Sequence, residues 1–306
     1  MNDRLLVVGG TGFIGRNLVL RALKYDFNIV VLSLHKPSNE KMIEGVDYIQ
    51  MDLSQSSMCN KDMLGGPFDY VVNLLGYVNH DKFLEGGRKV IQDHFEGLLN
   101  LLQLLEWSEL KKFIQIGSSD EYGNNPAPQK ENMRESPISS YSLSKVSCSH
   151  FLQMLHRTEE FPVVIFRLFL TYGPEQDNKR FIPQVIKGLM SDAGFPTSMG
   201  HQLRDFCYVD DIVEGILESF TNNKINGEVI NLASGSPVKV DYIIKLIQKK
   251  LGKGNPQFGG LLYRKGENME LYADISKANS ILNWKPTTPL EDGIDKTIEF
   301  YLTQLS

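Results

Sequence analysis

LLVVGGTGFIG, the stretch from Leu5 to Gly15, decides the fold of this chain. Its first residues form an apolar run that predicts a buried strand, and residues 16–24 continue with a helical pattern. Between the two, Gly9, Gly12 and Gly15 have the spacing GxxGxxG. Glycines allow a tight turn there, so that backbone amides can approach a pyrophosphate at the positive end of the helix. The stretch therefore predicts a dinucleotide-binding turn.

Apolar, β-branched runs alternate with longer segments of helical period through most of the first 230 residues. Fully apolar strands separated by helices are typical of a parallel sheet covered on both faces. The sequence thus predicts a doubly wound, Rossmann-like α/β fold. The expected strands are residues 4–8, 28–33, 48–50, 70–74, 112–117, 163–168 and 229–232.

The sequence pattern changes after Gly173-Pro174, where loops rich in Gly, Pro, Asn and Asp mix with shorter helices. We therefore expect two domains. Residues 1–173, with about 204–233, would form the dinucleotide-binding domain, and residues 174–203 and 234–306 a smaller α/β domain that binds substrate. That smaller domain is expected over the carboxyl edge of the sheet, where open α/β sheets bind ligands.

A second motif lies about 130 residues after the glycine turn, at Tyr141-Ser142-Leu143-Ser144-Lys145. A free tyrosine hydroxyl has a pKa near 10 and needs a nearby cation to relay protons at neutral pH. Lys145 lies one helical turn after Tyr141, on the same face, where its ammonium is expected to lower that pKa and hold a nicotinamide ribose. Ser118, at the end of an apolar strand, is expected to reach the same place and hydrogen-bond a substrate oxygen. The three residues predict hydride chemistry on a carbonyl or alcohol.

The end of the second expected strand indicates which dinucleotide binds. An NAD-binding chain would place Asp or Glu there for the adenosine ribose, whereas this strand ends Ser33-Leu34-His35-Lys36. No carboxylate is present to repel a 2′-phosphate, Ser33 can donate a hydrogen bond, and Lys36 supplies a charge. The pattern favours NADP(H) over NAD(H), unless His35 and Lys36 are simply solvated. The expected cofactor residues are Gly9, Thr11, Gly12, Phe13, Ile14, Gly15, Ser33, His35, Lys36, Asp52, Leu53, Leu74, Gly76, Tyr141 and Lys145.

At this point the chain resembles the extended short-chain dehydrogenase/reductase family, in its branch of nucleotide-sugar epimerases, dehydratases and reductases. The resemblance covers nearly the whole length and runs in order through GGTGFIG, GSSDEYG (117–123), YSLSK, RLFLTYGP (167–174), RDFCYVDDIV (204–213) and ADISKANSILNWKP (273–286). It implies a Rossmann domain, a smaller carboxy-terminal domain that grips a nucleoside-diphosphate sugar, and a homodimer built through a four-helix bundle.

Residue by residue, the resemblance makes Tyr141 the acid/base tyrosine, Lys145 its lysine and Ser118 the Ser/Thr of the site. Arg204 and Arg264 match arginines that hold the sugar nucleotide's pyrophosphate, a role that suits the planar, permanently charged guanidinium. The expected substrate-binding residues are Ser119, Asp120, Arg180, Arg204 and Arg264.

Departures from the family pattern bear on the reaction. Dehydratases of the family carry an acid and a base where this chain has Ser119 and Asp120, and Glu121 would face the other way if the strand continued. Many epimerases have Asn where this chain has Leu170. Epimerases and dehydratases also return the hydride within one turnover and keep NAD bound, whereas a net reductase must exchange its cofactor.

We therefore expect NADPH-dependent reduction of the C4 keto group of a nucleoside-diphosphate 4-keto-6-deoxyhexose, in the biosynthesis of activated 6-deoxy sugars. A 4-epimerase of nucleotide sugars with retained NAD is the alternative. A third reading is a catalytically inactive NADP-binding structural protein, because VVNLLG (71–76) departs from the family's usual sequence at the nicotinamide side.

Composition excludes several other classes. The net charge is −5 with the signs interspersed, so neither a nucleic-acid nor a membrane partner is expected. No segment approaches the roughly 20 apolar residues that span a bilayer, and we expect a cytoplasmic protein. Three widely spaced cysteines, Cys59, Cys148 and Cys207, suggest neither a disulfide framework nor a metal site.

Overall fold

A seven-stranded parallel sheet forms the centre of the computed structural model, which describes residues 2–191, 194–263 and 266–304. Its strand order is β10-β6-β5-β4-β1-β2-β3, and every neighbouring pair is parallel. The predicted doubly wound α/β fold is thus confirmed. The strands are β1 (Arg4–Val8), β2 (Asn28–Ser33), β3 (Val46–Gln50), β4 (Tyr70–Asn73), β5 (Lys112–Ser118), β6 (Val163–Leu168) and β10 (Val229–Leu232).

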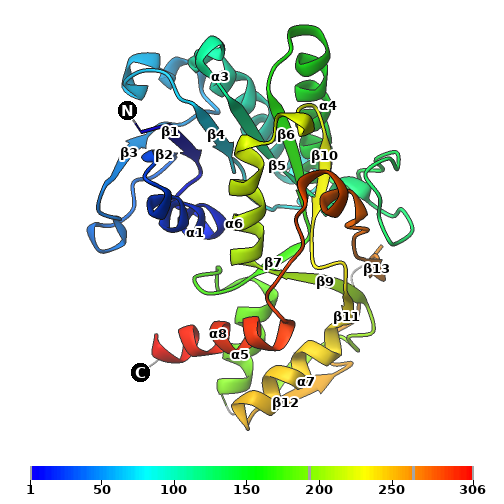
Figure 1. Cartoon of the computed structure of the whole chain (residues 1–306). Coiled ribbons are helices and arrows are strands. Elements are labelled where there is room, and N and C mark those ends of the chain that lie inside the picture. Colours follow the sequence, from blue (N-terminus) through cyan, green and yellow to red (C-terminus); the bar gives the residue numbers. More distant parts are fainter. Residues whose placement is uncertain (1, 192–193, 264–265, 305–306) are drawn as a thin grey trace.

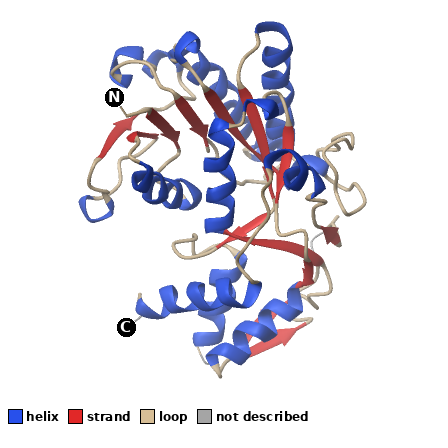
Figure 2. Cartoon of the chain, in the orientation of Figure 1, coloured by secondary structure: helices blue, strands red, loops and turns tan. Residues whose placement is uncertain are grey.

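Helices cover both faces of this sheet (Figures 1 and 2). Because side chains alternate along a strand, Leu5 and Val7 of β1 pack toward one face and Leu6 and Val8 toward the other. The first face is covered by α1 (Phe13–Ala22) and α6 (Val209–Glu218). The second is covered by α3 (Gly97–Leu104) and α4 (Ser140–Glu159), and a short helix α2 (Gly87–Ile91) packs beside α4.

A smaller α/β lobe lies at the carboxyl edge of the large sheet, at the bottom of Figure 1. Strand β9 (Leu203–Tyr208) is at the centre of its sheet and pairs with β7 (Leu170–Tyr172), β11 (Pro237–Lys239) and β13 (Glu270–Leu271). A separate parallel pair joins β8 (Gly194–Thr197) to β12 (Asn255–Phe258). The helices of the lobe are α5 (Phe181–Met190), α7 (Val240–Leu251) and α8 (Leu290–Thr303).

The two lobes share one hydrophobic core. The cluster that contains Leu5 and Val7 of β1 continues through α6 to Ile243 of α7 and Tyr301 of α8. Strand β9 belongs to the second sheet, although the sequence grouped residues from about 204 with the dinucleotide-binding part; α6 and β10 do return to the large sheet. The division into two domains at the expected boundaries stays a prediction.

The parallel sheet fixes where a ligand can bind. Strands β1 and β4 are neighbours, and the chain leaves them toward opposite faces of the sheet. In open α/β sheets, ligands bind at the carboxyl ends of such a strand pair. Within the described ranges, no helix is long and apolar enough to cross a membrane. The three cysteines are free thiols.

Candidate active site

The glycine turn lies at the carboxyl end of β1 and passes directly into α1. Gly9 has a positive φ of 77°, and its amide donates to the carbonyl of Leu32 in β2 at 2.7 Å. Gly12 is the N-cap of α1. A Cβ on Gly15 would lie 2.5 Å from the carbonyl oxygen of Gly9, so only glycine lets the helix come this close to the turn. The turn therefore fits the pyrophosphate of a dinucleotide, held by backbone amides at a helix N-terminus.

The other residues expected beside the cofactor surround this turn. Leu74 follows β4, and its carbonyl would be 3.1 Å from a Cβ on Gly9. Gly76 has a φ of 115° and leaves no space for a side chain, because a Cβ there would meet the ring of His94. Thr11 is exposed and Phe13 and Ile14 are half-buried at the start of α1. The structure brings these predicted residues together around the glycine turn and the end of β4.

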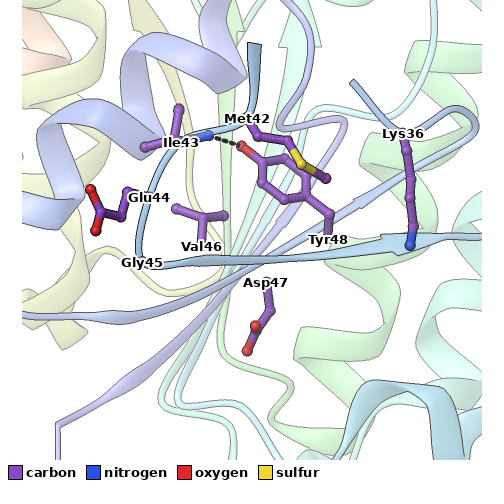
Figure 3. Close-up of a pocket in the computed structure, with 8 residues that line it drawn as sticks. All are labelled: Lys36, Met42, Ile43, Glu44, Gly45, Val46, Asp47 and Tyr48. Carbon is purple, nitrogen blue, oxygen red and sulfur yellow. Dashed lines mark hydrogen bonds between the residues drawn. The ribbon is translucent and has the colours of Figure 1, made fainter. Parts of the chain in front are cut away.

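Residues Ser33, His35 and Lys36 lie at the end of β2, the place expected for the adenosine ribose. Ser33 is buried, and its hydroxyl donates to the carbonyl of His35 at 2.8 Å, which holds this short turn. His35 and Lys36 are exposed. Figure 3 shows Lys36 beside a hollow that it lines with residues 42–48, among them Tyr48, whose hydroxyl accepts from the amide of Ile43 at 3.1 Å.

Asp52 and Leu53, two of the expected cofactor residues, hold the loop after β3. The carboxylate of Asp52 accepts from the Ser54 hydroxyl at 2.7 Å and from Gln55 at 2.7 Å, and the Ser54 hydrogen bond lowers its pKa. The carbonyl of Leu53 accepts from Asn100 of α3 at 2.8 Å. This loop therefore has a fixed shape.

Tyr141 and Lys145 lie in the first turns of α4, which begins with a capping box between Ser139 and Ser142. Both are almost fully buried, each with 6% of its surface exposed. The Lys145 ammonium donates to the carbonyl of Ile116 at 3.0 Å and to that of Leu75 at 3.3 Å. It lies 6.0 Å from the centre of the Tyr141 ring. The predicted pair is thus assembled, and the helix spacing accounts for it.

The electrostatics of the pair differ from the expectation that Lys145 lowers the pKa of Tyr141. Burial raises the pKa of the Tyr141 hydroxyl above its ordinary value, and a hydrogen bond with Ser118 is the largest opposing effect. Burial also lowers the pKa of Lys145. Both shifts arise because the two groups are buried away from water, which disfavours the charged form of each. The Lys145 ammonium donates its hydrogen bonds there to backbone carbonyls.

Ser118 ends β5 and caps a single helical turn, Ser119–Tyr122. Its hydroxyl accepts from the amide of Asp120 at 3.2 Å, and Glu121 accepts from the amide of Ser118 at 2.9 Å. The Glu121 carboxylate is fully buried and accepts from Nε of Arg167 at 2.9 Å. Glu121 therefore faces away from Asp120, as expected. The cause differs from the expected one, because the strand ends at Ser118 and the chain forms a helical turn over Ser119–Tyr122.

Four residues expected to bind substrate lie in the described ranges. Ser119 is buried. Oδ2 of Asp120 forms a hydrogen bond of 2.7 Å with Nε2 of His80. Arg204 of β9 is buried and pairs with Glu267. Arg180 caps α5, is exposed, and its charge acts on the Tyr141 hydroxyl. Arg264 lies outside the described residues.

Asp120 connects the two ends of this site. Its charge raises the pKa of Tyr141 on one side and that of Arg204 on the other, although burial keeps the pKa of Arg204 below its ordinary value overall. Asp120 is therefore within electrostatic range of both Tyr141 and Arg204.

Comparison with known proteins decides the family. Residues 5–233 match the model described as "NAD dependent epimerase/dehydratase family". This chain belongs to that family. The match begins within β1, just before the glycine turn, and extends through β10. It therefore includes every strand of the large sheet except the first residue of β1.

Relatives in this epimerase/dehydratase family match over almost their whole length. The chain is 26% identical to a UDP-glucuronate 4-epimerase of Thermodesulfobacterium geofontis, over 96% of this chain and 95% of the relative. It is 27% identical to a dTDP-glucose 4,6-dehydratase of Xanthomonas campestris, over 97% and 93%. The crystal structure of the UDP-glucuronic acid 4-epimerase from Bacillus cereus, in complex with UDP-glucuronic acid and NAD, is 28% identical, covers 99% of this chain and 100% of its own, and has a TM-score of 0.88.

Sequence reasoning missed two histidines of this site. His80, in the loop after β4, packs its ring at right angles to that of Tyr141, with centres 5.7 Å apart. His94, in the helical turn between α2 and α3, does the same at 5.5 Å and is buried, with no partner for Nδ1 among the described residues. A single histidine within an apolar helical stripe, or within a loop, carries no spacing that indicates a site.

Proposed function

We propose that this protein is an NADPH-dependent reductase of the C4 keto group of a nucleoside-diphosphate 4-keto-6-deoxyhexose. Membership of a family of nucleotide-sugar enzymes supports the substrate class. The observation that supports net reduction is the end of β2. It offers an exposed His35 and an exposed Lys36, held by the turn that the Ser33 hydroxyl closes, and the strand end itself has no carboxylate that would repel a 2′-phosphate. A reductase that exchanges its cofactor each turnover can then use the NADPH pool.

The chain's own residues would perform the proton chemistry. Bound NADPH would supply the hydride for C4. Tyr141 donates its proton to the C4 oxygen as that oxygen gains charge, and Ser118 donates a hydrogen bond to the same oxygen. Lys145 would hold the nicotinamide ribose and stabilise the tyrosinate, with its ammonium 6.0 Å from the centre of the Tyr141 ring. The raised pKa of Tyr141 keeps the phenol protonated, as a proton donor requires.

The sugar nucleotide would extend from Tyr141 toward the smaller lobe. Arg204 and Arg264 would hold the pyrophosphate, and Arg180 would face the sugar near Tyr141. Ser119 and Asp120 would contact the hexose between them. Each assignment follows from the position of the residue or, for Arg264, from the sequence pattern alone.

A 4-epimerase with retained NAD is the second candidate. It is supported by relatives that are UDP-sugar 4-epimerases, one of them determined in complex with NAD. The third reading, an inactive structural protein, is disfavoured because Ser118, Tyr141 and Lys145 lie together in the site.

The test of the reductase mixes the purified protein with NADPH and a freshly made dTDP-, CDP- or GDP-4-keto-6-deoxyhexose. We expect the NADPH absorbance band to disappear in proportion to sugar reduced, and Tyr141→Phe to lower the rate by about 10²–10⁴-fold while retaining cofactor binding. Tightly bound NAD that co-purifies and interconverts C4 isomers without net oxidation would establish the epimerase instead.

Cofactor choice is tested separately by binding measurements on Lys36→Glu. The variant should weaken NADPH binding more than NADH binding, because only NADPH carries the 2′-phosphate. Lys41→Glu, an equal charge change on an exposed lysine of the same loop, is the matched control and should leave the NADPH-to-NADH ratio unchanged. Equal losses for both cofactors in Lys36→Glu would contradict this account of β2.

A further inference from the structure

The buried carboxylate of Glu121 joins the two elements that carry the proposed catalytic residues. Its Oε1 accepts from the backbone amide of Ser118, at the end of β5, at 2.9 Å. Its Oε2 accepts from the hydroxyl of Ser149, in α4, at 3.0 Å. Glu121 is fully buried and Ser149 is 1% exposed. A single carboxylate therefore connects the end of β5 to α4 in the interior of the protein.

Ser149 lies on the side of α4 that carries the proposed acid–base pair. Tyr141, Lys145 and Ser149 are spaced by four residues, so they follow one another along one face of the helix. All three are buried. Lys145 forms the neighbouring contact with β5, since its ammonium donates to the carbonyl of Ile116 at 3.0 Å. Two buried polar contacts thus attach this face of α4 to the end of β5, and one of them ends on Glu121.

Arg167 and Gly117 fix the place of the Glu121 carboxylate. Nε of Arg167, in the neighbouring strand β6, donates to Oε2 at 2.9 Å, and both side chains are fully buried. A Cβ on Gly117 would collide with Oε1, so the carboxylate lies directly against the backbone of β5. Apolar residues of similar size would stabilise the fold as well as a buried ion pair does. The carboxylate differs from them in supplying directed acceptors for Ser118 and Ser149.

We propose that Glu121 is a positioning residue, which sets the distance between the hydroxyls of Ser118 and Tyr141 by fixing α4 to the end of β5. This role rests on the proposed function only through the proton transfer between Tyr141 and a C4 oxygen, which the reductase and the epimerase share. Both hydroxyls must reach that one oxygen, and misplacement by about 1 Å can cost about 100-fold in rate.

The test measures kcat, KM and cofactor affinity in two variants that disturb this contact from opposite sides. The assays use dTDP-4-keto-6-deoxyglucose with NADPH and, for the alternative reaction, UDP-glucose with NAD. Glu121→Gln keeps the shape of the side chain but leaves at least one of its three donors without an acceptor. Ser149→Ala removes only the donor on α4, and its folding is checked by thermal unfolding.

We expect kcat to fall about 10–100-fold in Glu121→Gln and at least about threefold in Ser149→Ala, while KM and the cofactor Kd stay within about twofold of the parent. Such a split separates a misplaced hydroxyl from a damaged binding site. Ser147→Ala is the matched control for Ser149→Ala. It removes a serine hydroxyl of the same helix that donates to the carbonyl of Leu143, and should keep the parent kcat.

Glu135→Gln separates positioning from ion pairing. Nη2 of Arg167 donates to Glu135 at 2.5 Å, so this variant also removes a carboxylate from Arg167 but leaves the contacts of Glu121 in place. It should lose thermal stability and keep the parent kcat. A second criterion uses Ser118→Ala as the background. There Glu121→Gln should lower kcat by less than about threefold, because a residue that acts through the Ser118 hydroxyl has little further effect once that hydroxyl is gone.

Two outcomes separate this role from the reductase. If the parent protein interconverts C4 isomers without consuming NADPH, the reductase fails, and a fall of kcat for that reaction in Glu121→Gln and Ser149→Ala upholds the positioning role. If the parent protein consumes NADPH and both variants keep its kcat, the positioning role is overturned and the reductase stands. A loss of kcat in Glu135→Gln as large as in Glu121→Gln would also overturn it, because the ion pair of Arg167 would then account for the effect.

Discussion

His94 shows at the scale of one residue how the fold sets chemistry. Its ring is 2% exposed and packs against Tyr141, and Nε2 lies 3.2 Å from the backbone of Tyr77. Burial, together with the charge of Lys145, lowers the pKa of His94 to about 3. The imidazole is therefore neutral at neutral pH.

The same shift predicts how stability depends on pH. The unfolded chain binds a proton at His94 below about pH 6.5, whereas the folded chain does not until about pH 3, so His94 costs stability as pH falls through this range. Between pH 7 and pH 4.5 the loss from this residue is about 3 kcal/mol. Urea unfolding at the two pH values should show that His94→Asn loses less stability than the parent protein. An equal loss in both would contradict a buried, neutral His94.

At the scale of an element, the start of α1 depends on contacts that leave no space for a side chain. At Gly15 a Cβ would be 2.5 Å from the Gly9 carbonyl oxygen and 2.6 Å from Cα of Gly10, both backbone atoms that cannot rotate away. At Gly12 the nearest atom would be 3.3 Å away. The turn and the helix thus hold each other in the shape that a pyrophosphate needs.

We expect Gly15→Ala to push α1 away from the turn, lower the free energy of unfolding by about 1–3 kcal/mol and weaken NADPH binding at least tenfold. Gly12→Ala is the matched variant in the same turn and should destabilise the chain less. Thermal unfolding without added cofactor, followed by a binding titration, measures both effects. Gly15→Ala with normal stability and affinity would show that the turn tolerates a side chain.

At the scale of the whole molecule, residues 284–288, which lead into α8 of the smaller lobe, pack against α6 of the large sheet and tie the two lobes together. Asp211 of α6 is 4% exposed and accepts hydrogen bonds from the Thr287 amide and hydroxyl and from the Thr288 amide. The indole of Trp284 donates to the carbonyl of Asp211 at 3.0 Å. In Figure 1 this segment, drawn in orange-red, runs beside α6 down to α8.

Asp211→Ala should therefore lower the free energy of unfolding by about 3 kcal/mol, since it removes a buried carboxylate that accepts three hydrogen bonds from Thr287 and Thr288. Asp295→Ala removes an exposed carboxylate of α8 that pairs with Lys250, and should change stability by less than about 1 kcal/mol. Urea unfolding of the three proteins provides the comparison. A loss in Asp211→Ala no larger than in Asp295→Ala would mean that this connection does not hold the lobes.

The strands of the large sheet could be predicted because their signals are local. Seven apolar runs predicted its seven strands, with β3 beginning two residues before the expected position. Tyr141 and Lys145 were found by their spacing on one helix, and the glycine turn by its place between a strand and a helix. What failed was electrostatic: the spacing gave no sign that burial would raise the pKa of Tyr141 while Lys145 donated to the backbone of β5.

The sequence by itself determined the parallel sheet, the glycine turn and the identity of the serine, tyrosine and lysine, because each depends on neighbours within a strand or a helical turn. Only the tertiary structure decided that β9 joins a second sheet, that Glu121 turns inward to Arg167, and that His80 meets Asp120 beside Tyr141. These contacts join segments that are distant along the chain. They depend on how loops close and how the elements pack, and periodicity carries no information about either.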